Sequence, residues 1–274
     1  MEMLYTRHNP FGNSHDVEDS DICFLLVPFD STNTGVSTSK WAPFIIKELL
    51  YLKEGYVPEL DVNPFEKLKI CDAGVLEVAP GSFEITKDRI TSTINEILEK
   101  NEKIIPFIIG GEHLISLPVV ESISTKKEFT IVQFDAHRDL RKDMFGVKYS
   151  HATWAYYAAK LKNVKGLLQI GIRSYSKEEK TEKLTNNIEE VEGPIYLTID
   201  MDVFDPSIAP EVNNPESGGI KFNDFKELTK KVAKNGIVGI DIVECTAKSF
   251  ESITASLAAD VIIWLLGLLA KNKF

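Results

Sequence analysis

Residues 131–139 are the part of the sequence that most restricts how the chain can fold. The mostly apolar run Ile-Val-Gln-Phe passes directly into Asp135-Ala-His137-Arg-Asp139. Because successive side chains of an extended chain point to opposite sides, Asp135, His137 and Asp139 can converge on one side. Carboxylates and neutral imidazoles are ligands for divalent cations such as Mn²⁺, Zn²⁺ or Fe²⁺. Taken alone, the stretch predicts either a buried strand that ends in a metal site or a solvated strand end.

Three other apolar runs end in residues of the same kinds. Residues 104–109 lead into Gly-Gly-Glu-His113, residues 195–199 into Asp200-Met-Asp202, and residues 236–242 into a segment that contains Glu244. In open parallel sheets, ligands bind beyond the carboxyl ends of the strands. If these runs are parallel strands of one sheet, we expect their ligand-type side chains to meet at one edge.

The number of such residues favours two metal ions. One ion needs fewer ligands, whereas two ions about 3.5–4 Å apart that share carboxylates would use them all. Without cations, carboxylates packed this densely would repel one another strongly. The sequence therefore favours a metal site over solvated strand ends, with the candidate ligands His113, Asp135, His137, Asp139, Asp200 and Asp202.

The order of the predicted elements indicates the fold class. Strands are expected at 22–27, 68–72, 104–109, 131–135, 167–173, 195–199 and 236–242, and helices at 41–53, 86–100, from 114 onward, 154–161, 222–234 and 252–270. We expect the charged segment 176–192 to be a solvated surface helix and loop. This alternation, without repeats or a linker, predicts a single domain over residues 1–274, a three-layer α/β/α fold with a mostly parallel sheet.

Composition and charge restrict the partners. The formal net charge of −10 argues against nucleic acid or an anionic membrane surface and suits a cationic small molecule. Three widely spaced cysteines in apolar segments predict buried thiols. The apolar run 261–270 is shorter than the roughly 20 residues of a membrane span and predicts a core helix. No secretory leader is recognisable, so we expect a cytoplasmic location. The polar residues 1–20, with His8 and His15, predict a surface arm without ligands.

Five blocks, in order, resemble the signature of the ureohydrolase family, which includes the arginases and agmatinases. They are Gly-Gly-Glu-His at 110–113, Asp-Ala-His-Arg-Asp at 135–139, Ser-His-Ala-Thr at 150–153, Asp-Met-Asp-Val-Phe-Asp-Pro at 200–206 and Asp-Ile-Val-Glu at 241–244. With the loop at 28–30 and the last helix, the resemblance spans nearly the whole chain. It implies an arginase-like fold, two Mn²⁺ per subunit and a homo-oligomer, either a trimer or a hexamer.

The resemblance also implies a role for each residue. Asp135 and Asp200 would bridge the two ions, with His113 and Asp139 completing the shell of one ion and His137 and Asp202 that of the other. Asp139 would relay a proton from the attacking solvent. His151 would pass a proton towards the leaving amine. Glu244 would bind the guanidinium group, with His151 and Asn214 as further substrate-binding residues.

The closest resemblance is to the agmatinases, which predicts cleavage of agmatine to putrescine and urea. Arginases usually carry Asp-Ile-Asn where this chain has Asp139-Leu-Arg141, which argues against arginine as the substrate. The loop 212–216 reads Val-Asn-Asn-Pro-Glu where the family usually has Thr-Gly-Thr-Pro-Glu, which leaves the substrate open.

Other activities remain as alternatives. They are an arginase, a guanidinobutyrase, a formimidoylglutamase, a deacetylase-like enzyme with a single zinc ion, and a non-catalytic metal-stabilised scaffold. An anionic substrate would require a basic residue in the pocket, for which Arg138 and Arg141 are the candidates.

Overall fold

The computed structural model describes residues 16–34, 38–185 and 187–273. His8 and His15, assigned by the sequence to a polar surface arm, lie outside the described residues.

The described strands form one eight-stranded sheet in the order β2-β1-β3-β8-β7-β4-β5-β6. Every pairing between these strands is parallel, so the expectation of a mostly parallel sheet is confirmed. The strands are β1 (Ile22–Val27), β2 (Ile70–Val75), β3 (Ile105–Gly110), β4 (Phe129–Phe134), β5 (Val164–Ile170), β6 (Leu184–Thr185), β7 (Ile195–Asp200) and β8 (Ile237–Val243).

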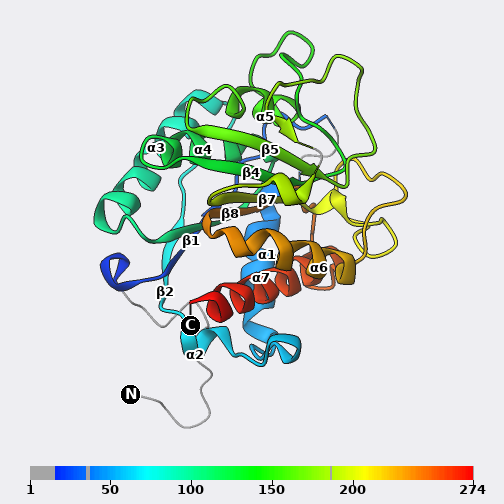
Figure 1. Cartoon of the computed structure of the whole chain (residues 1–274). Helices are drawn as coiled ribbons and strands as arrows, with labels where there is room; N and C mark the ends of the chain where they lie inside the picture. Colours follow the sequence, from blue (N-terminus) through cyan, green and yellow to red (C-terminus); the bar gives the residue numbers. More distant parts are fainter. Residues whose placement is uncertain (1–15, 35–37, 186, 274) are drawn as a thin grey trace.

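Helices cover both faces of the sheet, as Figure 1 shows. One layer contains α3 (Phe83–Lys100), α4 (Ser116–Ser124) and α5 (Trp154–Ala158), and the other contains α1 (Ala42–Leu52), α6 (Phe222–Val232) and α7 (Ile253–Asn272). A short helix, α2 (Pro64–Lys67), packs beside α7. The predicted three-layer α/β/α architecture is therefore confirmed.

The alternation of side chains along each strand divides the core into two hydrophobic clusters. On β4, Ile131 packs in the cluster that includes Trp154 of α5, whereas Val132 and Phe134 pack in the cluster that includes Phe225 of α6. All six residues of β4 are buried, as expected for a central parallel strand with both faces covered.

The last helix, α7, is a core element. Its residues from Val261 to Leu266 are all buried, which confirms the core helix predicted there. By length and composition α7 is the one helix among the described residues that could cross a membrane, but 72% of its apolar window is buried inside the protein. The three cysteines are free and buried, as predicted.

The structure corrects two predicted elements. The strand expected at 167–173 begins earlier, at Val164, and ends at Ile170, because Gly171 turns the chain away with φ +94°. A side chain at Gly171 would also collide with Val203, 2.5 Å from the position of a Cβ atom. The surface helix expected within 176–192 is absent among the described residues: this segment holds only the short β6 and a 3₁₀ turn at Ile188–Glu190.

Candidate metal-binding active site

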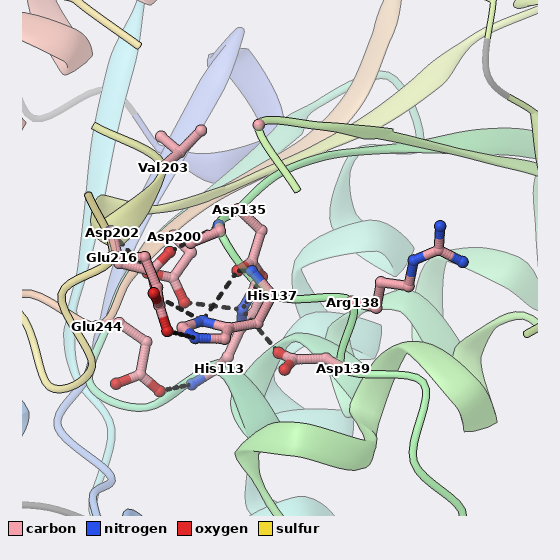
Figure 2. A network of polar contacts seen from close by, with 12 residues as sticks. His113, Asp135, His137, Arg138, Asp139, Asp200, Asp202, Val203, Glu216 and Glu244 are labelled. Carbon is pink, nitrogen blue, oxygen red and sulfur yellow. Dashed lines mark hydrogen bonds and ion pairs between the residues drawn. The ribbon is translucent and has the colours of Figure 1, made fainter. Parts of the chain in front are cut away.

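The four strands whose ends carry the candidate residues are neighbours at the centre of the sheet. In the order β3-β8-β7-β4, they end at Gly110, Val243, Asp200 and Phe134. Because these strands run parallel, their carboxyl ends lie at one edge, where the candidate ligands gather (Figure 2). The structure therefore brings together all six residues predicted as metal ligands.

The turn after β3 depends on its glycines. Gly111 donates its backbone N–H to the carbonyl oxygen of Val27. It lies so close to the loop after β1 that a Cβ atom at this position would be 2.1 Å from the carbonyl oxygen of Phe29. Only glycine permits this approach. The turn directs His113 into the centre of the site, where its side chain is fully buried.

His113 is the centre of the first group of ligand atoms. Its Nδ1 lies 3.2 Å from Asp135 Oδ2, 3.2 Å from Asp200 Oδ2 and 3.3 Å from Asp139 Oδ2. This buried nitrogen has no hydrogen-bond partner. The other ring nitrogen, Nε2, lies 2.8 Å from Thr198 Oγ1, whose hydroxyl group donates in turn to Asp241. An imidazole nitrogen that faces three carboxylates is an arrangement that suits a bound cation.

His137 and Asp202 form a second group beside the first. His137 Nδ1 lies 2.8 Å from Asp202 Oδ2 and 3.7 Å from Asp135 Oδ1. The two oxygens of Asp135 therefore face different histidines, so that Asp135 belongs to both groups. Glu216, 3.7 Å from His137 Nε2, borders the second group (Figure 2).

The density of charge shifts the titration of these groups. Burial and then the charges of Asp202 and Asp139 raise the pKa of Asp135 to about 7. Burial also raises the pKa of Asp200 well above its usual value. Burial opposes protonation of His137, but the contact with Asp202 outweighs it and raises the pKa of His137 to about 10. Carboxylates that repel one another when ionised, together with imidazole donors in two overlapping groups, fit a pair of divalent cations.

The surrounding backbone and side chains hold these carboxylates in place. Asp135 Oδ1 accepts from the backbone N–H of His137 at 2.6 Å, and Asp135 Oδ2 accepts from Gln133 Nε2 at 2.7 Å. Asp139 has a left-handed backbone with φ 54°, and the next N–H, that of Leu140, donates to Glu179. Such a conformation in a residue other than glycine is typical of functional sites.

A cavity of about 270 Å³ opens above the ligand groups. Its lining includes His137, Asp139, Asp200 and Asp202, together with the residues predicted to act on the substrate, namely His151, Glu244 and Asn214. The structure thus brings these predicted residues into the same cavity as the ligand groups.

Glu244 is anchored on both of its oxygens. Oε1 accepts from the backbone N–H of His113 at 2.7 Å, and Oε2 accepts from the side chain of Asn213 at 2.9 Å. Burial raises the pKa of Glu244 to about 8. Burial also lowers the pKa of His151, which favours a neutral imidazole.

Sequence reasoning missed several residues of the cavity lining, among them Asn213 and Glu179. Asn213, and not only its predicted neighbour Asn214, contacts Glu244 and lines the cavity. Glu179, from the segment expected to be a solvated helix, is buried, lines the cavity and accepts from the N–H groups of Leu140 and Ser176. The sequence around Glu179 contains no signal that predicts its role. Asn213 could have been predicted, because it is adjacent to Asn214.

Of the two arginines considered for an anionic substrate, the structure favours one. Arg141 lines the cavity. Arg138 instead stacks on Tyr175, 4.1 Å from the ring centroid, and donates to the backbone carbonyl of Glu179. Figure 2 shows its side chain directed away from the ligand groups, so the candidate role of Arg138 is wrong.

Comparisons with known proteins identify relatives of this chain. The chain is 33% identical to the N(1)-aminopropylagmatine ureohydrolase of Thermococcus kodakarensis over 99% of both chains. It is 30% identical to an agmatinase of Pyrococcus horikoshii, covering 93% of this chain and 94% of that protein. Among solved structures, the agmatine ureohydrolase of Thermoplasma volcanium matches with a TM-score of 0.82 and 26% identity, over 98% of this chain and 96% of that one.

The model of the arginase family matches residues 20–267, nearly the whole chain. The resemblance stated from the sequence, the fold class and the expectation of an enzyme are thereby confirmed. With its candidate ligand set assembled at the carboxyl edge of a parallel sheet, the chain belongs to the arginase family, a family of metal-dependent hydrolases.

Proposed function

We propose that this chain is a binuclear manganese hydrolase that cleaves a linear guanidino compound to urea and an amine, with agmatine as the leading substrate and putrescine as the amine. The observation that carries the proposal is the pair of ligand groups that share Asp135 in a cavity also lined by His151 and Glu244. The names of the relatives from Thermococcus and Pyrococcus support a guanidino substrate.

The residues of the first group, His113, Asp135, Asp139 and Asp200, would hold one Mn²⁺, and Asp135, Asp200, His137 and Asp202 would hold the other. When bound, such a pair of cations activates a water molecule and stabilises developing negative charge. Mixed carboxylate and imidazole ligands suit Mn²⁺.

Glu244 would bind and orient the guanidinium group. A carboxylate and a guanidinium can form two parallel charge-assisted hydrogen bonds. The bonds that Glu244 accepts from the His113 backbone and from Asn213 fix the direction of the carboxylate, and each oxygen keeps a further lone pair for the substrate. The cationic substrate would also favour the ionised form of Glu244.

His151 would complete the reaction by proton transfer. Attack of water on the central guanidinium carbon gives a tetrahedral intermediate, and its collapse expels an amine that must gain a proton. Asp139, which also lines the cavity, can accept the proton of the attacking water, and His151 can take up this proton on its ring and pass it to the amine.

A second candidate substrate class is favoured by Arg141. The position of this cation in the cavity lining suits the carboxylate of an ω-guanidino acid such as 4-guanidinobutyrate and disfavours a second positive charge. We further propose that the protein is a homo-oligomer, as the family resemblance implies, and that it is cytoplasmic.

The test is urea release from agmatine, N(1)-aminopropylagmatine, arginine and 4-guanidinobutyrate by Mn²⁺-loaded protein, with a chelated control. We expect metal-dependent urea from agmatine at the highest kcat/KM. Replacing Arg141→Ala should leave the agmatine activity unchanged or raise it, and should lower any activity on 4-guanidinobutyrate. Urea release from 4-guanidinobutyrate alone would support the proposed hydrolysis but show that 4-guanidinobutyrate, and not agmatine, is the substrate. No urea from any of the four compounds would refute the proposal.

A further inference from the structure

We propose that Glu112 is a positioning residue, which holds His151 through Thr32 in the orientation needed for proton transfer. The inference rests on the proposed function, because that function gives His151 its role. Glu112 is fully buried and lies outside the lining of the cavity, so that it acts through its neighbours and not on the substrate.

Thr32 holds His151 at two points. The backbone N–H of His151 donates to Thr32 Oγ1 at 2.9 Å, and the ring Nδ1 lies 2.9 Å from the carbonyl oxygen of Thr32. Because a carbonyl oxygen can only accept, Nδ1 must carry a proton. In the neutral ring the lone pair is then on Nε2, the nitrogen left to take up a proton and pass it to a molecule in the cavity. The contact with Thr32 thus fixes both the tautomer and the direction of the ring.

Glu112 holds Thr32 in turn. Its Oε2 accepts from the backbone N–H groups of Ser31 and Thr32, each at 2.7 Å, and its Oε1 accepts from the hydroxyl group of Thr32 at 2.7 Å. The hydroxyl hydrogen of Thr32 is therefore committed to Glu112, which leaves Oγ1 free to accept from His151. The carboxylate thus makes three bonds, and all of them go to the segment that orients the ring.

The turn that carries Glu112 is itself docked onto this segment. The backbone N–H of Glu112 donates to Phe29 at 2.9 Å, and that of Gly111 donates to Val27 at 3.0 Å. The N–H of Glu244 donates to the carbonyl oxygen of Gly111 at 2.7 Å. One turn therefore connects the candidate ligand His113, the guanidinium-binding Glu244 and, through Glu112, the proton donor His151.

The experiment compares Thr32→Val with Thr32→Ser in Mn²⁺-loaded full-length protein. Valine removes the hydroxyl group that links Glu112 to His151, whereas serine keeps it. Loss of a well-placed general acid lowers the reaction rate about 10²–10⁴-fold, and misplacing the acid lowers the rate by a smaller factor. We therefore expect Thr32→Val to lower kcat about tenfold with little change in KM, and Thr32→Ser to stay within about twofold of the original.

Glu112 is tested in the same way. Glu112→Ala should lower kcat at least as much as Thr32→Val. Glu112→Gln should restore most of the activity, because its carbonyl oxygen can accept from both backbone N–H groups. Manganese content, measured in every variant, shows whether the neighbouring ligand His113 has been disturbed.

A second readout does not require hydrolysis. Hydrogen exchange at the ring C2 position of each histidine, followed by mass spectrometry, should speed up several-fold at His151 in Thr32→Val and Glu112→Ala, and stay unchanged at His113 and His137. This pattern supports the inference even if agmatine is not the substrate. Equal kcat values and equal exchange rates at His151 in Thr32→Val and Thr32→Ser would overturn the inference. An effect of Glu112→Ala that is confined to the exchange at His113 and to the manganese content would also overturn it.

Discussion

Trp154 donates a hydrogen bond from its indole Nε1 to Asp139 Oδ2, 3.0 Å away. The same indole stacks on His113, with ring centroids 4.5 Å apart. One buried side chain of α5 therefore orients two of the six candidate ligands. Trp154 therefore belongs to the hydrophobic core and also contacts the candidate metal site directly.

The substitution Trp154→Phe should weaken metal binding, while the phenyl group keeps an aromatic ring beside His113. Loss of a residue that orients a metal ligand typically costs 10–100-fold in affinity. The indole donor has no equivalent in phenylalanine, so Asp139 would lose its partner. Competition with a fluorescent chelator measures the Mn²⁺ affinity, and an unchanged affinity would show that Asp139 does not depend on the indole.

Thr198 offers a matched test on the other side of His113. Its hydroxyl group lies between His113 Nε2 and Asp241, so Thr198→Val should break this connection while Thr198→Ser keeps it. We expect the valine variant to bind Mn²⁺ about 10–100-fold more weakly. If serine and valine weaken binding equally, the shape of the side chain and not its hydroxyl group is responsible.

The metal-free protein should become less stable as the pH rises from about 5 to 8. The folded-state pKa of Asp135 is raised from 3.8 to about 7, and that of Glu244 from 4.5 to about 8, in both cases chiefly by burial. In this window the folded state binds more protons than the unfolded chain, so the free energy of unfolding falls with rising pH. The raised pKa of His137, about 10, acts in the same direction.

Thermal unfolding in the presence of a chelator measures this effect. The melting temperature should fall between about pH 5.5 and pH 8, and saturating Mn²⁺ should raise it by a larger amount at the higher pH, where the ligands are deprotonated. A melting temperature that rises with pH in the chelated protein would contradict the buried, densely charged site.

The loop residues Asn213 and Asn214 can be separated by kinetics. Asn213→Ala removes the hydrogen bond to Glu244 Oε2 and should raise KM about fivefold or more, the equivalent of about 1 kcal/mol. Asn214→Ala, which lines the same cavity, should change KM less. Steady-state kinetics on the same substrate compares the KM values of the two variants. A larger increase in KM for Asn214→Ala would show that Asn214, the residue predicted from the sequence, contributes more to substrate binding than Asn213.

The sequence was most informative where the chemistry is local. The ligand-type residues at 135–139 and the apolar runs before His113, Asp200 and Glu244 predicted which side chains gather at the sheet edge. The expected strand alternation at 135–139 was wrong, because β4 ends at Phe134 and Asp139 has a left-handed backbone. The strands have both faces covered, so their apolar runs are continuous and easily recognised. For the same reason the three-layer fold could be predicted from the order of strands and helices.

The residues that escaped prediction depend on contacts between distant parts of the chain. Glu179 stands among other charged residues, and only the tertiary fold directs it to the N–H of Leu140. The contact of Thr32 with His151 joins residues 119 positions apart. Arg138 and Arg141 stand on either side of the left-handed Asp139, a backbone conformation that periodicity does not reveal.

The most direct test of the central claim compares urea release and bound metal in the original protein and in His137→Ala. His137 contacts Asp135 and Asp202 in the second ligand group only. We predict about two Mn²⁺ per chain and chelator-sensitive urea release from agmatine in the original protein. In His137→Ala we predict fewer bound ions and a loss of kcat/KM of at least about 100-fold. Undiminished urea release by His137→Ala, or a metal-loaded original protein that releases no urea, would contradict the account.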